Sequence, residues 1–154
     1  MFRTTLANYI NVLKPRETSL LAFIGAATVF IAARGIPPRG TLLLATLAIL
    51  IASAAANGFT NYLDRNLDCL MPRTQNRALA AKRIEPAEKA LPMLFILAAI
   101  GLALAWMVHP YAFLADLIGT VVAVTFRKKV TCVFPQGAIA GCAPVLMGWF
   151  AIEP

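Results

Sequence analysis

Residues 57–77 read NGFTNYLDRNLDCLMPRTQNR. This stretch begins inside an apolar segment, carries two carboxylates out of it and ends among arginines. Four of its polar residues are spaced four, three and four apart: Asn57, Asn61, Asp64 and Asp68. On a helix that turns about 100° per residue, this spacing keeps all four within about 60° of one another. We therefore expect them to form one narrow polar stripe, on which a ligand site could be built.

The two carboxylates of the stripe are a candidate metal site. Asp64 and Asp68 lie one helical turn apart, and Pro72 predicts the end of the helix just before Arg73 and Arg77. Mg²⁺ prefers one or two carboxylates together with phosphate oxygens, and arginine binds anionic oxygens bidentately. The alternative is a solvated pair of surface carboxylates, because such pairs are common at helix ends. Polar groups that directly continue a membrane-length apolar run favour a functional site.

The composition indicates a membrane protein rather than a soluble domain. Of 154 residues, 60% are hydrophobic and 14% are charged, and the mean hydropathy is +0.74. The net charge is +7, but the basic residues lie between apolar runs, so membrane topology explains them better than nucleic acid does. The three cysteines, Cys69, Cys132 and Cys142, do not have the spacing of a metal site.

Five apolar segments approach the length that crosses a bilayer. They cover residues 18–33, 41–62, 91–108, 111–126 and 135–152. An amphipathic segment over residues 1–17 precedes them, and a polar connection over residues 64–90 with a short helix near 84–90 separates the second from the third. We therefore expect an all-α, polytopic transmembrane helix bundle.

The basic residues also orient these segments. Three lysines and arginines precede the first segment, six lie between the second and the third, and three follow the fourth. Only two follow the first segment, and none lies between the third and the fourth. Since positive charge concentrates on the cytoplasmic side, we expect the N-terminus and the Asp/Arg stretch to be cytoplasmic in a multi-pass protein of the plasma membrane.

Asp116 is a further candidate, because it lies inside the fourth apolar segment. A carboxylate within a membrane span is a functional hypothesis by default. An Asp that packs between helices through a hydrogen bond is the alternative, and the sequence leaves this choice open.

The motifs resemble those of a known family. Residues 61–79, NYLDRNLDCLMPRTQNRAL, resemble the first aspartate-rich motif of the UbiA superfamily of intramembrane prenyltransferases. Their D-R-x-x-D and M-x-R-T-x-x-R-x-L spelling is most similar to the protohaem IX farnesyltransferase (haem O synthase) branch. Residues 14–23, KPRETSLLAF, resemble the entry to the first span of the same branch, and residues 126–149, FRKKVTCVFPQGAIAGCAPVLMGW, resemble its later basic stretch and the helix that follows. The family has about nine spans and a second aspartate-rich motif, so the five segments here read as its N-terminal half.

The resemblance implies a reaction and a set of site residues. The family transfers farnesyl from farnesyl diphosphate to haem B within the bilayer and gives haem O, and ionisation of the diphosphate needs cations around the leaving group. By resemblance, Asp64 and Asp68 hold Mg²⁺, with Asn57 and Asn61 as further polar ligands or orienting groups. Four cations would hold the diphosphate or the haem propionates: Arg73, Arg77, Lys14 and Lys128.

Two alternatives remain open. A relative that prenylates a quinone precursor or another lipid acceptor would share the first motif, and a non-catalytic, truncated membrane fragment would use the aspartates for packing or topology. We expect residues 1–154 alone to be inactive or nearly so. If the chain is a haem farnesyltransferase, we expect downstream haem-modifying oxidase machinery to be a partner. Nucleic acid is not an expected partner under any of these alternatives.

Overall fold

The structure is a computed structural model that describes residues 2–125 and 134–153. Within these residues it is built from helices and contains no strand, which confirms the predicted all-α class. The helices are α1 (Phe2–Val12), α2 (Pro15–Ala32), α3 (Arg39–Asp68), the short 3₁₀ helix η1 (Ala87–Ala90), α4 (Leu91–Val108), α5 (Pro110–Thr125) and α6 (Phe134–Phe150).

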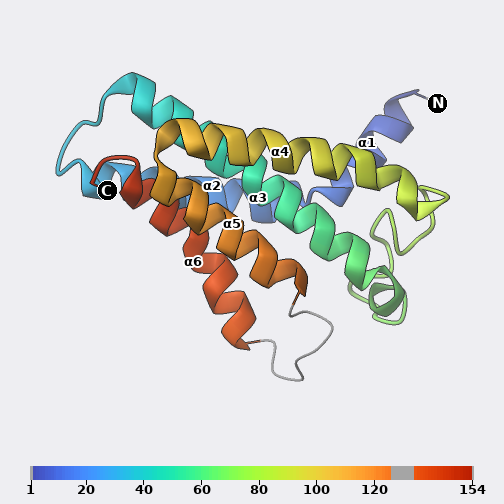
Figure 1. The fold of residues 1–154 in the computed structure, drawn as a ribbon. Coiled ribbons are helices and arrows are strands. Elements are labelled where there is room, and N and C mark those ends of the chain that lie inside the picture. The colour runs from blue at the N-terminus through green and yellow to red at the C-terminus, as the bar shows by residue number, and fades with distance from the viewer. Residues whose placement is uncertain (1, 126–133, 154) are drawn as a thin grey trace.

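The long helix α3 organises the bundle. It packs against α2 and α4, while α5 packs against α6 and α6 returns to α2 (Figure 1). The helices α4 and α5 form a tight hairpin, since only His109 separates them. Figure 1 places α1 and the connection between α3 and α4 at the same end of the bundle. This arrangement brings the N-terminal residues next to the polar end of α3.

The helix at the polar stripe ends earlier than we expected. We expected it to continue until just before Pro72, whereas α3 ends at Asp68. The chain then forms tight turns, in which the amide of Met71 donates to the carbonyl of Asp68 and the hydroxyl of Thr74 donates to the same carbonyl, at 3.3 and 3.1 Å. Side-chain capping therefore ends this helix before the proline does. The short helix expected near 84–90 is the 3₁₀ turn η1.

Small residues allow the helices to approach closely. A Cβ atom added at Gly101 would lie 2.9 Å from the Cα of Ala52, so α4 and α3 meet backbone to backbone there. A Cβ atom at Gly148 would collide with the carbonyl oxygen of Gly25, so α6 and α2 meet in the same way. Close contact of this kind through Gly and Ala is typical of helices that pack inside membranes.

The outside of the bundle is strongly apolar. Large hydrophobic side chains such as Phe23, Leu43, Phe95 and Met107 are each more than 60% exposed. Two helical stretches of the described residues, Arg39–Asp68 and Ala87–Val108, are long and apolar enough to cross a membrane. The helices α5 and α6 are apolar but shorter. Each of the five apolar segments thus contains a helix, and an exposed apolar surface of this extent fits a protein embedded in lipid.

A small hydrophobic cluster fixes the segment after α3, residues 69–86, which we call the polar loop. Ala78, Leu79 and Ile84 of this loop are buried against Val12 of α1 and Leu94 of α4. The loop is therefore packed against two helices, and its charged residues have defined positions relative to the end of α3.

Candidate functional site

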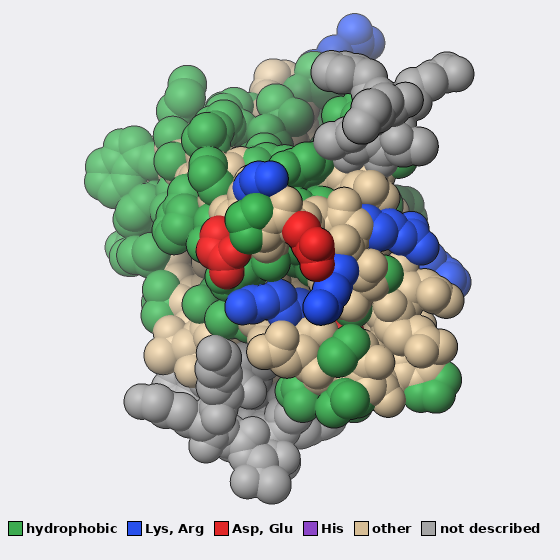
Figure 2. Space-filling model, turned by 90° about the vertical axis from the view of Figure 1, so that its right-hand side faces the viewer, with side chains coloured by type: hydrophobic (Ala, Val, Ile, Leu, Met, Phe, Trp, Pro, Cys, Tyr) green, Lys and Arg blue, Asp and Glu red, His purple; other side chains and the backbone are tan. Residues whose placement is uncertain are grey.

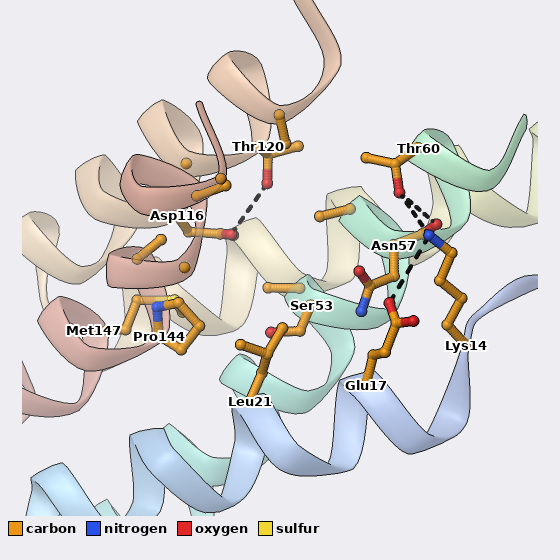
Figure 3. Close-up of a pocket in the computed structure, with 18 residues that line it drawn as sticks. Lys14, Glu17, Leu21, Ser53, Asn57, Thr60, Asp116, Thr120, Pro144 and Met147 are labelled. Carbon is orange, nitrogen blue, oxygen red and sulfur yellow. Dashed lines mark hydrogen bonds and ion pairs between the residues drawn. The ribbon is translucent and has the colours of Figure 1, made fainter. Parts of the chain in front are cut away.

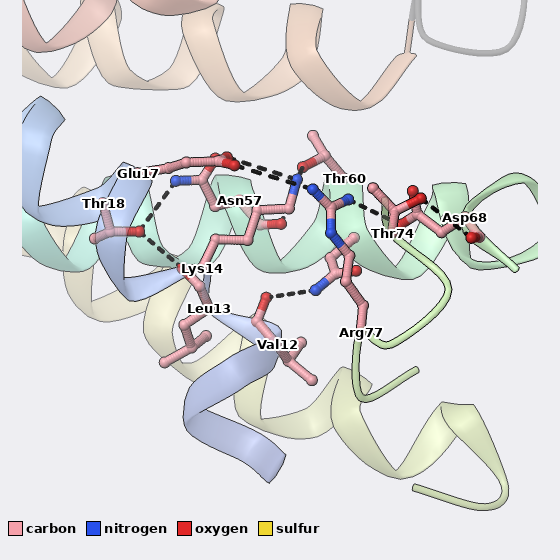
Figure 4. A network of polar contacts seen from close by, with 11 residues as sticks. Val12, Leu13, Lys14, Glu17, Thr18, Asn57, Thr60, Asp68, Thr74 and Arg77 are labelled. Atoms are coloured by element: carbon pink, nitrogen blue, oxygen red, sulfur yellow. Dashed lines mark hydrogen bonds and ion pairs between the residues drawn. The ribbon is translucent and has the colours of Figure 1, made fainter. Parts of the chain in front are cut away.

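The segment between α1 and α2 is hydrogen-bonded to the polar stripe of α3. Asn61 donates from Nδ2 to the carbonyl of Val12 at 3.0 Å, and Asn57 donates from Nδ2 to the hydroxyl of Thr18 at 3.0 Å. The Thr18 hydroxyl in turn donates to the carbonyl of Leu13 at 2.8 Å (Figure 4). We call residues 12–18 the junction; they comprise the end of α1, the turn and the start of α2. These bonds fix the junction to one face of α3.

Lys14 lies at the centre of the junction in an unusual backbone conformation. Its φ of 49° and ψ of 65° are left-handed, which costs a non-glycine residue about 1–2 kcal/mol. The hydrogen bonds on either side of Lys14 hold it in this conformation. Its side chain is only 10% exposed, and Nζ donates to the hydroxyl of Thr60 on α3 at 3.4 Å. Backbone strain of this kind often accompanies a functional position.

A chain of charges continues from Lys14 to the polar loop. Glu17 places Oε2 3.9 Å from Lys14 Nζ and Oε1 4.0 Å from the NH2 atom of Arg77. Arg77 also binds Asp68 through its NH1 atom, at 2.9 Å from Oδ2. The side chain of Asp68 is 8% exposed, and that of Arg77 is 21% exposed. Figure 4 shows this network joining α2, the end of α3 and the polar loop.

Lys14 and Glu17 of this network also line one wall of a cavity of about 260 Å³, whereas Asp68 and Arg77 do not (Figure 3). The remaining walls come from α5 and α6 and consist largely of glycine and alanine. The polar side chains that line the cavity are Lys14, Glu17, Ser53, Asn57, Thr60, Asp116 and Thr120. The cavity thus has a charged rim on the side of the junction and a mostly apolar interior.

Asp116 provides the polar group on the opposite wall. It is buried on α5 and accepts a hydrogen bond at Oδ1 from the hydroxyl of Thr120, one turn further along, at 3.3 Å. Figure 3 shows both side chains across the cavity from Lys14 and Asn57. The hydrogen bond of Asp116 thus lies within α5 rather than between helices, and its side chain faces the cavity.

The other predicted residues lie at different depths. Asn61 is fully buried and does not line the cavity, and its Oδ1 atom has no hydrogen-bond partner. Asp64 is partly exposed on the same stripe, and Arg73 is exposed on the polar loop. Lys128 lies outside the described residues. Glu17 was missed by the sequence reasoning, although its spacing of three from Lys14 at the start of a helix was a usable signal.

The donor set of the stripe is suited to a hard cation. Asp64 and Asp68 supply carboxylate oxygens one turn apart, which are ligands that a hard cation prefers. In the part of the chain that the structure describes, no three acidic, histidine or cysteine side chains form a ready-made metal cage. The stripe therefore fits Mg²⁺ bound by two carboxylates plus phosphate oxygens, rather than a closed protein site.

One end of the molecule carries a group of charged side chains. Figure 2 views the end that lies on the right in Figure 1, and acidic and basic side chains alternate near the centre of this face. Hydrophobic and uncharged side chains surround them. Mixed charges of this kind leave the cations available to an anion that can compete with the carboxylates.

Comparison with known proteins shows which family the chain resembles. The model of the UbiA prenyltransferase family matches residues 20–154. The chain is 36% identical to a protoheme IX farnesyltransferase of Desulforudis audaxviator, over 98% of this chain and 50% of that protein. It is 35% identical to proteins of the same name from Stutzerimonas stutzeri and Thermofilum pendens, over 94% and 92% of this chain. The chain spans about half the length of these curated relatives, and no solved structure matches it.

Proposed function

This chain belongs to the UbiA prenyltransferase family, and we propose on that basis that it is part of a protohaem IX farnesyltransferase. The reaction would transfer farnesyl from farnesyl diphosphate to haem B and give haem O. The observation that carries this proposal is the cavity beside the aspartate-rich helix. Its rim carries Lys14 and Glu17, and Arg77 joins Glu17 to Asp68.

The rim residues provide what an allylic diphosphate needs in order to ionise. Negative charge develops on the leaving diphosphate, and positioned cations stabilise it. Lys14 is held by the junction and Arg77 by Asp68, so both cations are oriented before a ligand arrives. Arg73, Lys128 and the amides of Asn57 and Asn61 complete the proposed set, of which Asn61 acts through the junction because it is fully buried.

Mg²⁺ is the cofactor that we propose for this site. Asp64 and Asp68 would hold it, and when bound it would neutralise charge on the diphosphate oxygens. Asp68 is bound to Arg77 in the structure, so Arg77 neutralises this carboxylate. A cation at Asp68 would therefore have to share that carboxylate with Arg77 or displace it.

The interior of the cavity suits the allylic cation that forms when the diphosphate leaves. Apart from Asp116 and Thr120, its walls from α5 and α6 are glycine, alanine and other apolar residues, which would limit the access of water to an allylic cation. A volume of about 260 Å³ suits the reacting end of a prenyl chain rather than the whole substrate, because pockets for drug-sized ligands start at about 300 Å³. The exposed apolar helices would leave the rest of the tail in lipid.

We further propose the setting of this reaction. The protein would be a multi-pass protein of the plasma membrane, with the N-terminus and the charged end on the cytoplasmic side, because the basic residues concentrate there. Haem-modifying oxidase machinery would use the product. Water-soluble farnesyl diphosphate could then reach the charged rim from the cytoplasm.

The acceptor is tested by competition in membranes that contain the natural gene product. Labelled farnesyl diphosphate, Mg²⁺, haem B and an aromatic quinone precursor are supplied together, and the products are separated by chromatography. We expect label in haem O only. Label in the aromatic product would assign the chain to a quinone-type prenyltransferase, and no labelled product would support a non-catalytic membrane protein.

A further inference from the structure

We propose that Glu17 competes with anionic ligands by holding Lys14 and Arg77, and so sets how strongly an anion must bind in order to enter the site. This inference rests on the proposed function, since it concerns the same anion site. Neither the spacing of the aspartates nor the family resemblance assigns a role to Glu17. Its position between two cations from separate parts of the chain points to one.

The geometry of Glu17 is that of a bound anion. Its two oxygens face different cations, with Oε2 3.9 Å from Lys14 Nζ and Oε1 4.0 Å from Arg77 NH2. Lys14 comes from the junction and Arg77 from the polar loop, so the carboxylate bridges two segments that are far apart in sequence (Figure 4). An external anion that binds both cations must take the place of this carboxylate.

The exposures show which partner can move. The side chain of Lys14 is 10% exposed and that of Arg77 is 21% exposed, whereas that of Glu17 is 55% exposed. Arg77 uses NH1 for Asp68 and NH2 for Glu17, so it remains anchored by Asp68 when Glu17 leaves. Lys14 likewise keeps its bond to the hydroxyl of Thr60. The cations are therefore fixed, and Glu17 can turn toward solvent.

The contacts of Glu17 with Lys14 and Arg77 are weak, so Glu17 opposes the binding of an external anion only modestly. Exposed ion pairs contribute about 0.2–1 kcal/mol each, so a ligand can displace Glu17 at a modest cost. A ligand that carries a carboxylate or a monophosphate resembles Glu17 in charge. It therefore gains little binding free energy when it displaces Glu17. A diphosphate carries more charge and more oxygens and can form bidentate bonds to the guanidinium, so it gains more than it loses. Anions that bind weakly therefore stay at low occupancy, because each anion that enters must offset the cost of displacing Glu17.

The test compares inorganic pyrophosphate with inorganic phosphate. The protein is placed in lipid nanodiscs with Mg²⁺ present, and binding is measured by calorimetry for the wild type and for Glu17→Gln. We expect Glu17→Gln to bind phosphate roughly three- to tenfold more tightly, which corresponds to the loss of about two weak ion pairs. We expect a gain of the same size or larger for pyrophosphate, because it must displace the same carboxylate and carries more negative charge.

A matched control is available at the opposite end of the bundle. Glu153 lies 4.0 Å from Arg34 with its side chain 47% exposed, so Glu153→Gln makes the same change in charge at a similar pair. It should leave both affinities unchanged. Lys14→Met should weaken pyrophosphate binding, which would show that the measured ligand occupies this site. Glu17→Ala should act in the same direction as Glu17→Gln.

Three results would overturn the proposal. They are an effect of Glu17→Gln no larger than that of Glu153→Gln, weaker phosphate binding in Glu17→Gln, and no pyrophosphate binding in any variant. None of these measurements involves prenyl transfer. Tighter binding of both anions in Glu17→Gln together with no haem O in the competition assay would leave this inference standing and reject the proposed acceptor.

Discussion

Asn61 illustrates how burial changes the interpretation of a predicted ligand. Its spacing places it on the same stripe as Asp64 and Asp68, and the structure keeps it there. Its side chain is nevertheless fully buried and donates to the carbonyl of Val12. This contact favours an orienting role, in which Asn61 fixes the junction and thereby the position of Lys14.

We predict that Asn61→Ala destabilises the protein by about 1–3 kcal/mol, because the buried carbonyl of Val12 loses its donor. The measurement is unfolding in mixed detergent micelles. Pyrophosphate binding should also weaken, since Lys14 would lose part of its support. The matched control is Asn66→Ala, which removes an exposed amide from the same helix. It should change neither the stability nor the affinity for pyrophosphate. Equal stability of the Asn61→Ala variant and the wild type would contradict the orienting role.

At the level of single residues, the sequence predicted the stripe but not its contacts. Helical spacing was sufficient to place Asn57, Asn61 and the two aspartates on one face of α3. The pairing of Arg77 with Asp68 depends on the turns of the polar loop, and the position of Glu17 depends on how α2 crosses α3. Neither of these follows from spacing within one helix.

At the level of helices, α2 and α6 pack in close contact. Gly148 lies against the carbonyl of Gly25, and an added Cβ atom would also lie 3.1 Å from the Cβ of Thr28. The backbone oxygen of Gly25 cannot move aside as the end of a flexible side chain can. The contact between these helices, which lie far apart in sequence, therefore depends on the absence of a side chain at Gly148.

We predict that Gly148→Ala destabilises the fold by about 1–3 kcal/mol, because the two helices must separate to admit a methyl group. Thermal unfolding in detergent measures the effect. Gly40→Ala is the control, since an added Cβ at Gly40 meets nothing within 4 Å, and the greater helix propensity of alanine should make this change neutral or stabilising by at most about 1 kcal/mol. If both variants were equally stable, the described packing of α6 on α2 would be wrong.

The helices themselves were largely predictable, but their ends were not. Long apolar runs gave the positions of the five main helices, because few other structures satisfy the backbone within lipid. The end of α3 was predicted too late, since Pro72 was taken as the stop and the hydroxyl of Thr74 caps the carbonyl of Asp68 first. Capping by a side chain six residues away leaves only a weak signal in the sequence.

At the level of the whole molecule, the cavity is the feature that the sequence could not provide. Its two polar walls come from α3 with the junction and from α5, and they meet because α6 packs on both α5 and α2. Asp116 faces Lys14 and Asn57 only in this arrangement (Figure 3). Composition and charge predicted a membrane bundle with a charged end, whereas the packing of the helices decided which residues share a site.

We propose that the aspartates, the junction and the polar loop form a Mg²⁺-dependent diphosphate site. The most direct test of this proposal is equilibrium binding of farnesyl diphosphate to the protein in nanodiscs, with Mg²⁺ and with EDTA, for the wild type, Asp64→Asn, Asp68→Asn and the exposed control Glu88→Gln. We predict binding that is lost in EDTA and reduced at least tenfold in both aspartate variants, and unchanged in Glu88→Gln. Binding of equal strength without Mg²⁺, or in the two aspartate variants, would contradict the account.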